Sequence, residues 1–203
     1  GLGLDRVIVI PTFISPHKSG CLSARAKDRL EMCRLAFNGI AEVSDYEVKR
    51  GGISYSYVTC RHFKKLYEDD ELYFILGADS LKGFDEWRYP EEILKCVTLA
   101  VCARAGSDSL APLLKSFTAK YKRDIVTFDY LGKNVSSTRV RALAALGGDI
   151  TGLTPPAVKS YIIKNGLYKL PEIDGYKKYL TAERLDHTLR VAVTAAENCR
   201  RAR

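Results

Sequence analysis

Five short runs of apolar residues, separated by segments with helical periodicity, restrict the folds open to this 203-residue chain. The runs span 7–10, 43–48, 72–76, 97–102 and 125–130, and the second is the least apolar. Apolar side chains follow one another within a run instead of alternating with polar ones, which is typical of parallel strands covered by helices. The pattern therefore predicts an α/β fold, with a parallel sheet, helices on both faces and right-handed crossovers.

The segments between the runs predict helices with recognisable ends. Residues 26–37 place apolar side chains on one helix face, with Ser23 as the expected start. A second helix is expected over about 57–67. A third begins with Thr154 and two prolines and ends at 165–166, Asn-Gly. In folds of this class ligands bind at the carboxyl ends of the strands, so we expect the chemistry just after these ends.

Composition excludes several classes of protein. Hydrophobic residues make up 46% of the chain and charged ones 28%, so the bulk is not disordered. The net charge of +8 suits an anionic partner but does not separate nucleic acid from nucleotides. No apolar run approaches the roughly 20 residues of a membrane-spanning helix. The six cysteines form no C-x-x-C pair, so we expect neither a metal site nor disulfides, and a cytoplasmic location.

The first strand leads into a loop with two prolines that ends in His17 and Lys18. The prolines restrict the backbone of the loop, and the two basic side chains at its tip could hold an anion. A rigid surface loop with a solvated lysine is the other interpretation.

The third strand ends in Gly77, and Asp79 and Trp87 follow it. A carboxylate at the tip of a buried strand can accept a ribose hydroxyl, and an exposed indole can stack on a planar ring. In the other interpretation Asp79 caps a helix and Trp87 belongs to the core.

The fifth strand leads to a helix start at which Ser136 and Ser137 place hydroxyl groups, with two arginines, Arg139 and Arg141, about one turn further on. Such a helix N-terminus is an anion site. The helix end contributes only about 0.3–1 kcal/mol toward a negative charge, so the arginines must supply most of the binding. An ordinary serine cap with surface arginines is the other interpretation. Together the three strand ends predict a pocket for a nucleotide with several phosphates.

Six motifs in this order resemble the bacterial nicotinate-nucleotide adenylyltransferases, which join ATP and nicotinate mononucleotide to give deamido-NAD and pyrophosphate. The motifs are Pro-x-x-x-x-Pro-His-Lys at 11–18, Gly-Gly-Ile-Ser-Tyr-Ser at 51–56, Gly-Ala-Asp-Ser-Leu at 77–81, Val-Cys-Ala-Arg at 101–104, Val-Ser-Ser-Thr-Arg-Val-Arg at 135–141 and Pro-Pro-x-Val-x-x-Tyr-Ile, ending in Gly-Leu-Tyr, at 155–168. The resemblance covers residues 1–170 and implies a Rossmann-like sheet of the nucleotidyltransferase type.

The resemblance also implies a role for each matching residue. On the nicotinate mononucleotide side, Ser56 would lie beside the nicotinate, Asp79 beside a ribose and Trp87 on the pyridine ring. On the ATP side the phosphates would be held by His17, Lys18, Arg104, Ser136, Ser137 and Arg141. Lys18 and Arg141 would be the catalytic pair, and Mg²⁺ would arrive with ATP.

This chain departs from the family pattern at several points. The family carries a His-x-Gly-His motif in a Gly-rich loop after its first strand, and none of the three histidines here belongs to one. We therefore expect the domain over 1–170 to lack its first strand, that loop and most of its first helix, and the chain alone to be inactive. Ser56 stands where the family usually has Thr, Val58 where it often has Asp, and Arg88 where an aromatic residue is common.

Residues 171–203 are expected to form a linker and the first helix of a second domain. The segment 179–192 resembles the opening of an HD-type metal-dependent phosphohydrolase domain, in which His187 would be the first metal ligand. The other ligands would lie beyond Arg203, so no metal is assigned to this chain.

Three alternatives stay open. A sister enzyme of the same fold would adenylylate nicotinamide mononucleotide or phosphopantetheine, and a remnant without the histidine motif would be non-catalytic. A basic nucleic-acid-binding module is the third, although the basic residues are scattered and form no known nucleic-acid motif. The expected partners are thus ATP and nicotinate mononucleotide, with no nucleic acid and no membrane, and the chain is compatible with a homo-oligomer.

Overall fold

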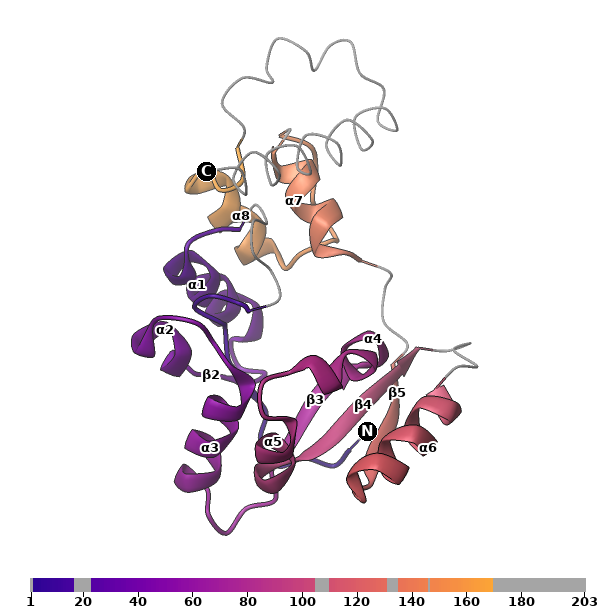
Figure 1. Cartoon of the computed structure of the whole chain (residues 1–203). Coiled ribbons are helices and arrows are strands. Elements are labelled where there is room, and N and C mark those ends of the chain that lie inside the picture. Colours follow the sequence, from indigo (N-terminus) through magenta and orange to yellow (C-terminus); the bar gives the residue numbers. More distant parts are fainter. Residues whose placement is uncertain (1, 17–22, 105–109, 131–134, 146, 170–203) are drawn as a thin grey trace, which may run out of the picture. The chain divides into compact units, whose positions relative to one another are not determined.

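The computed structural model describes residues 2–16, 23–104, 110–130, 135–145 and 147–169 (Figure 1). Contacts divide the chain into two compact units, which we describe separately. Unit 1 consists of Gly1–Asp5 and Ser54–Lys133, and unit 2 of Arg6–Ile53 and Asn134–Arg203. The motif at 11–18 lies partly outside the described residues, and the segment 171–203 lies wholly outside them.

Unit 1 is built on a parallel sheet of three strands in the order β3, β4, β5. The strands are β3 (Tyr73–Gly77), β4 (Thr98–Arg104) and β5 (Ile125–Tyr130). Gly77 is paired with Cys102, and Arg104 with Tyr130, so the three carboxyl ends lie along one edge of the sheet. The apolar runs predicted these strands to within two residues.

Helices connect the strands of unit 1, as parallel pairing requires. Between β3 and β4 lie α4 (Ala78–Lys82), the short 3-10 helix η1 (Phe84–Glu86) and α5 (Pro90–Cys96), and between β4 and β5 lies α6 (Leu110–Tyr121). A further helix, α3 (Ser56–Leu66), precedes β3. The helix predicted over 57–67 is confirmed as α3. Figure 1 shows α6 alongside the sheet, between β4 and β5 in the chain.

The core of unit 1 gathers side chains from the sheet and from these helices. Phe84, Ile93, Leu99 and Val101 are each at most 1% exposed. Complete burial of one such side chain contributes roughly 1.5–3 kcal/mol, so these residues fix the crossover helices against the strands.

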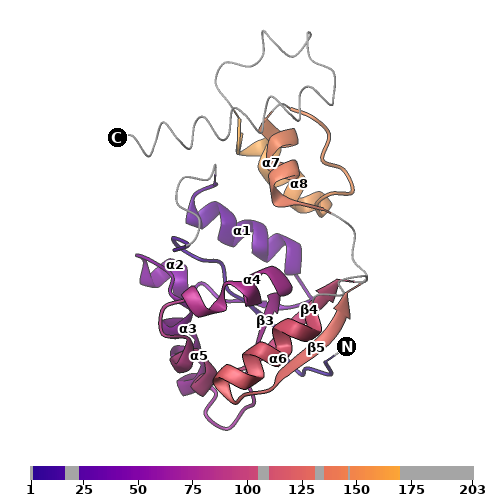
Figure 2. The same cartoon turned by 45° about the vertical axis from the view of Figure 1, so that its right-hand side comes forward.

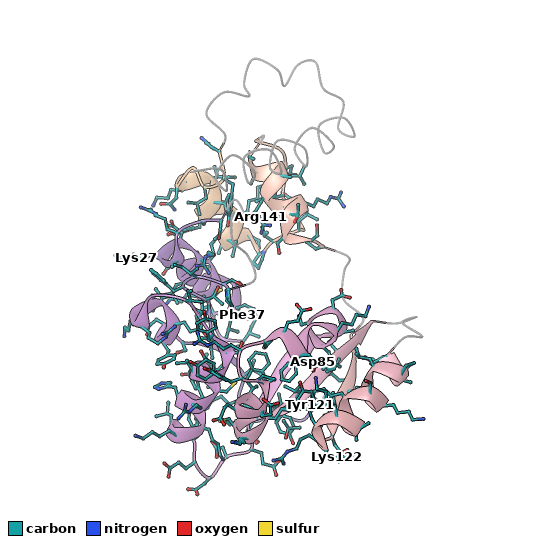
Figure 3. The ribbon with its side chains drawn as sticks, in the orientation of Figure 1. Lys27, Phe37, Asp85, Tyr121, Lys122 and Arg141 are labelled. Atoms are coloured by element: carbon teal, nitrogen blue, oxygen red, sulfur yellow. The ribbon has the colours of Figure 1, made fainter. Side chains whose placement is uncertain are left out.

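A polar contact fastens η1 to α6 at the edge of this core (Figure 3). The Tyr121 hydroxyl donates a 2.5 Å hydrogen bond to Oδ1 of Asp85, and Nζ of Lys120 lies 2.6 Å from Oδ2. Burial, together with the Asp85 carboxylate, raises the pKa of Tyr121 to about 12. The hydroxyl therefore keeps its proton and remains a donor at neutral pH.

Unit 2 contains a second, two-stranded parallel sheet. In it β1 (Ile8–Val9) pairs with β2 (Glu42–Val43). The predicted strand over 43–48 is wrong beyond Val43, because α2 (Tyr46–Arg50) begins there. The Ser44 hydroxyl accepts a 3.3 Å hydrogen bond from the backbone N–H of Tyr46, which supports a turn into the helix instead of further extension.

Three longer helices complete unit 2: α1 (Ala26–Phe37), α7 (Ser137–Ala145) and α8 (Pro156–Lys164). Figure 2 shows α7 and α8 side by side, and their residues Val140, Val158 and Ile162 share one buried cluster. Met32 and Leu35 of α1 pack against the same cluster. The helix predicted over 26–37 is confirmed.

The sequence predicted only some of the ends of these helices correctly. The expected start at Ser23 is wrong, because Arg25 precedes α1 and the Ser23 hydroxyl bonds to the carbonyl of Ala24 instead. Past α8, Gly166 has φ 58°, the left-handed conformation that a helix stop often requires and that glycine adopts readily.

The predicted α/β fold class is confirmed, because every strand pairing within the described residues is parallel and helices connect the strands. None of the helices in that part of the chain has the length and apolar character needed to cross a membrane.

Candidate functional site

Asp79 lies at the carboxyl edge of the unit 1 sheet, as predicted. It is the second residue of α4, which begins directly after Gly77 ends β3. The residue preceding this helix is Gly77, so Asp79 is not its N-cap, and its side chain is 93% exposed with Nζ of Lys82 at 3.5 Å. This carboxylate faces solvent, where it can accept hydrogen bonds from the hydroxyl groups of a ligand.

Trp87 follows η1 and is half-buried. Its ring meets Phe74 at 5.9 Å in a T-shaped contact and Phe84 at 5.4 Å, and it packs against the core of unit 1. The interpretation that places Trp87 in the core is therefore correct in part. Its stacking on a ligand ring stays a prediction.

Ser56 is the first residue of α3 and is half-buried. Its neighbours in the sequence are two tyrosines. Ser54, two residues earlier, is only 4% exposed. The chain that leads into the first turn of α3 is thus packed in the interior at Ser54. Ser56, Asp79 and Trp87, the three residues predicted on the nicotinate side, thus all belong to unit 1.

The helix N-terminus predicted to bind phosphates belongs to unit 2. The Ser136 hydroxyl accepts a 3.1 Å hydrogen bond from the backbone N–H of Arg139, which is the geometry of an N-cap. Ser137 opens α7 and is exposed. Arg141, one turn further on, is half-buried and has a long 3.5 Å hydrogen bond to Oγ1 of Thr138 (Figure 3).

Arg29 is a residue that the sequence did not single out. It lies on α1 and donates three hydrogen bonds, to Oγ1 of Thr12 at 3.2 Å, to the carbonyl oxygen of Phe13 at 2.7 Å and to that of Ala24 at 3.2 Å. The guanidinium therefore joins the chain after β1 to the chain before α1. Only the folded structure reveals this contact, because the partners lie up to 17 residues away in sequence.

The positive charges of Arg29 and Arg141 both affect the pKa of the same residue, Tyr168. Burial raises the pKa of the Tyr168 hydroxyl, and the positive charges of Arg141 and Arg29 oppose that rise. Tyr168 also hydrogen-bonds to the backbone of Ala24, at the start of α1. The charge of the Asp28 carboxylate acts on Tyr168 in the opposite direction. Two guanidinium groups and one carboxylate thus lie near this tyrosine, and the guanidinium groups can attract an anionic ligand.

The remaining predicted residues are described only in part. His17 and Lys18 lie outside the described residues, and Arg104 is the last residue of β4, at the carboxyl edge of the sheet. Within the described ranges, no group of three His, Cys, Asp or Glu side chains could hold a metal ion. The cysteines described, Cys33, Cys60, Cys96 and Cys102, are free thiols.

Known proteins resemble this chain over most of its length, although no protein-family model matches it. A probable nicotinate-nucleotide adenylyltransferase from Clostridium botulinum (strain Langeland) is 33% identical over 171 residues, which are 82% of this chain and 85% of the relative. Proteins of the same description from Clostridium tetani and Desulfitobacterium hafniense are 36% and 37% identical, over 83% and 82% of this chain and 86% and 83% of the relatives.

Solved structures show the same fold. Nicotinic acid mononucleotide adenylyltransferase from Plasmodium falciparum superposes with a TM-score of 0.57 in complex with APC and of 0.59 in complex with NaAD. The identity is 18%, and the alignment covers 80% of this chain and 82% of the other.

Proposed function

Because the chain belongs to the nicotinate-nucleotide adenylyltransferase family, we propose that it transfers the adenylyl group of ATP to nicotinate mononucleotide. The products are deamido-NAD, a precursor in NAD biosynthesis, and pyrophosphate. The observation that carries this function is the 33–37% identity to relatives of that description over about four-fifths of the chain.

The reaction sets a simple physical demand. A phosphate oxygen of the mononucleotide forms a bond to the α-phosphorus of ATP, and the bond from that phosphorus to the β-phosphate oxygen breaks as pyrophosphate leaves. Both reactants are anions, so catalysis consists mainly of holding them close and neutralising their charge. No covalent intermediate with the protein is needed. Mg²⁺ enters with its substrate, bound to the triphosphate of ATP.

On the ATP side, unit 2 supplies the cations. We assign Arg141, with Ser136 and Ser137, to the phosphates at the N-terminus of α7. The convergence of Arg141 and Arg29 on Tyr168 supports this assignment, because a cluster of positive charge favours a polyphosphate. His17 and Lys18 are assigned to the same phosphates from the sequence alone, and Arg104 is a further candidate.

On the mononucleotide side, unit 1 supplies Ser56, Asp79 and Trp87. The exposed carboxylate of Asp79 suits a ribose with two hydroxyl donors. The half-buried indole of Trp87 is braced by Phe84, so a pyridine ring would stack on a surface that does not have to be ordered first. Ser56 would hydrogen-bond beside the ring from the start of α3.

We place the reaction in the cytoplasm, and the free thiols support this location. No observation favours nucleic acid or a membrane as a partner. A homo-oligomer stays compatible with the chain, and light scattering of the purified protein would give its mass.

The experiment that tests the function identifies the product. The protein is incubated with MgATP and, in separate tubes, nicotinate mononucleotide, nicotinamide mononucleotide or phosphopantetheine, and the products are identified by mass spectrometry. It is run on the 203-residue chain and on a chain extended in frame upstream, since the family's histidine motif is not among these residues. We expect deamido-NAD as the main product of the extended chain, whereas dephospho-coenzyme A or no product at all would contradict the proposal.

A matched pair of variants locates the ATP site. Arg141→Met should lower the rate of product formation by about tenfold or more, because a charged hydrogen bond to phosphate is lost. Arg139→Met, on the exposed surface of the same helix, should leave the rate nearly unchanged. Equal effects of the two substitutions would argue against the assignment of Arg141.

A further inference from the structure

Arg88 is an exposed cation held between two tyrosine rings of unit 1. Its guanidinium carbon lies 4.8 Å from the ring centroid of Tyr55 and 5.3 Å from that of Tyr89. A guanidinium at these distances is attracted by the electrons of the ring faces. Hydrogen bonds with the hydroxyl groups of Tyr89 and Tyr55 raise the pKa of Arg88 above its ordinary value. The group is thus charged, oriented and open to solvent.

The two rings are themselves held in place. Tyr57 packs against the core and meets the ring of Tyr89 edge-on at 5.0 Å, and its ring lies 6.1 Å from that of Tyr55. The backbone of Tyr89 has φ 55° and ψ 60°, a left-handed conformation that costs an ordinary residue energy. A residue keeps such a conformation only where its surroundings impose it, and such positions cluster at functional sites.

The contacts of Arg88 with Tyr55 and Tyr89 connect the two sequence segments assigned to the pyridine ring. Tyr55 directly precedes Ser56, and Arg88 directly follows Trp87. The positive charge of Arg88 therefore lies next in sequence to the residues that would contact the nicotinate. The candidate substrates differ at one group on that ring, because nicotinate carries a carboxylate and nicotinamide a neutral amide.

We infer that Arg88 determines specificity: its guanidinium, oriented by Tyr55 and Tyr89, binds the carboxylate of the pyridine mononucleotide and so favours the acid over the amide. A planar guanidinium matches a carboxylate with two parallel hydrogen bonds, whereas an amide offers one neutral acceptor and no charge. The inference rests on the proposed function, since only a pyridine mononucleotide presents this choice.

The first test uses the chain extended upstream and compares kcat/KM for the two mononucleotides with MgATP. Its variants are Arg88→Met, Arg88→Lys and the control Arg123→Met, an exposed arginine before β5. Arg88→Met should lose roughly 10- to 100-fold with the acid and little with the amide, because only the acid loses a charged hydrogen bond. Arg88→Lys should recover part of the loss, and Arg123→Met should match the parent. Equal losses with both mononucleotides would overturn the inference, because a structural role or a phosphate contact affects both alike.

A second measurement separates this inference from the proposed function. Trp87 is the sole tryptophan of the chain, so its fluorescence reports binding without turnover. Nicotinate and nicotinamide mononucleotide are titrated into the parent and into Arg88→Met. Selective binding of the acid that Arg88→Met abolishes supports the inference, even if no product forms and the proposed function fails. Equal binding of the two by the parent overturns it, even if adenylyl transfer is observed.

Discussion

The guanidinium of Arg29 donates a 2.7 Å hydrogen bond to the carbonyl oxygen of Phe13, sixteen residues earlier in the chain. The same group reaches Thr12 and the carbonyl of Ala24, so one side chain of α1 holds the chain on both sides of the segment that contains His17 and Lys18. Because the proposed function assigns phosphate binding to that segment, Arg29 should act as a positioning residue for it.

Replacement of Arg29 by Met should therefore affect both stability and activity. The loss of three hydrogen bonds should lower the free energy of unfolding by about 1–3 kcal/mol in urea titrations. It should also raise KM for ATP. Arg34→Met, on the exposed side of the same helix, is the control and should change stability by less than about 0.5 kcal/mol. A variant that loses stability but keeps its KM for ATP would exclude a positioning role.

Substitutions of Ser136 can separate its capping role from phosphate binding. Ser136→Ala removes the hydrogen bond to Arg139 and should cost about 1 kcal/mol of stability. Ser136→Asp keeps a good cap but places a negative charge where the ATP phosphates would lie. It should therefore retain stability and lose ATP binding, as measured by calorimetric titration. Unchanged ATP affinity in Ser136→Asp would remove Ser136 from the ATP site.

Asp79 is predicted to be the reverse case, a ligand-binding side chain that contributes little to stability. Its carboxylate is 93% exposed, so Asp79→Asn should change the free energy of unfolding by less than about 0.5 kcal/mol. Loss of the charged acceptor should raise KM for nicotinate mononucleotide by about tenfold. Glu86→Gln, an exposed carboxylate in η1, is the matched control and should leave both quantities unchanged. A normal KM in Asp79→Asn would argue against a ribose contact.

Asp28 should make unit 2 sensitive to acid. It is 4% exposed, and its carboxylate accepts hydrogen bonds from Arg25 at 2.9 Å and from the Tyr161 hydroxyl at 3.1 Å, which lower its pKa. A depressed folded-state pKa gives stability that is present above the unfolded value of about 3.9 and is lost as pH falls through the folded-state value.

Urea titrations between about pH 6 and pH 2 measure this effect. Asp28→Asn should be less stable than the parent at the upper end of this range and should approach it at the lower end. Tyr161→Phe, which removes one hydrogen bond between α1 and α8, should cost about 1 kcal/mol at neutral pH. A constant difference between Asp28→Asn and the parent across the range would show that the carboxylate does not titrate as described.

Local sequence pattern predicts much of this fold. The continuous apolar runs locate β3, β4 and β5 because a buried parallel strand needs apolar side chains on both faces. The strand predicted from the run at 43–48 was wrong beyond Val43, since a polar residue, Ser44, interrupts the run and initiates a turn toward α2. Helix α6 was not predicted, although Pro112 lies in its first turn, where proline is tolerated.

The candidate site was predictable only where it follows strand ends. The position of Asp79 after β3 comes from the sequence, because a strand and the turn after it are local features. The contact of Arg88 with Tyr55 and that of Arg29 with Thr12 join residues far apart in the chain, so no local pattern reports them.

The most direct measurement is the initial rate of pyrophosphate release from MgATP, with nicotinate mononucleotide in one reaction and nicotinamide mononucleotide in the other. The extended chain should release pyrophosphate with either mononucleotide, and faster with nicotinate mononucleotide. The 203-residue chain should release none. Release by neither chain with either mononucleotide would contradict the account, and the family membership would then record ancestry without this activity.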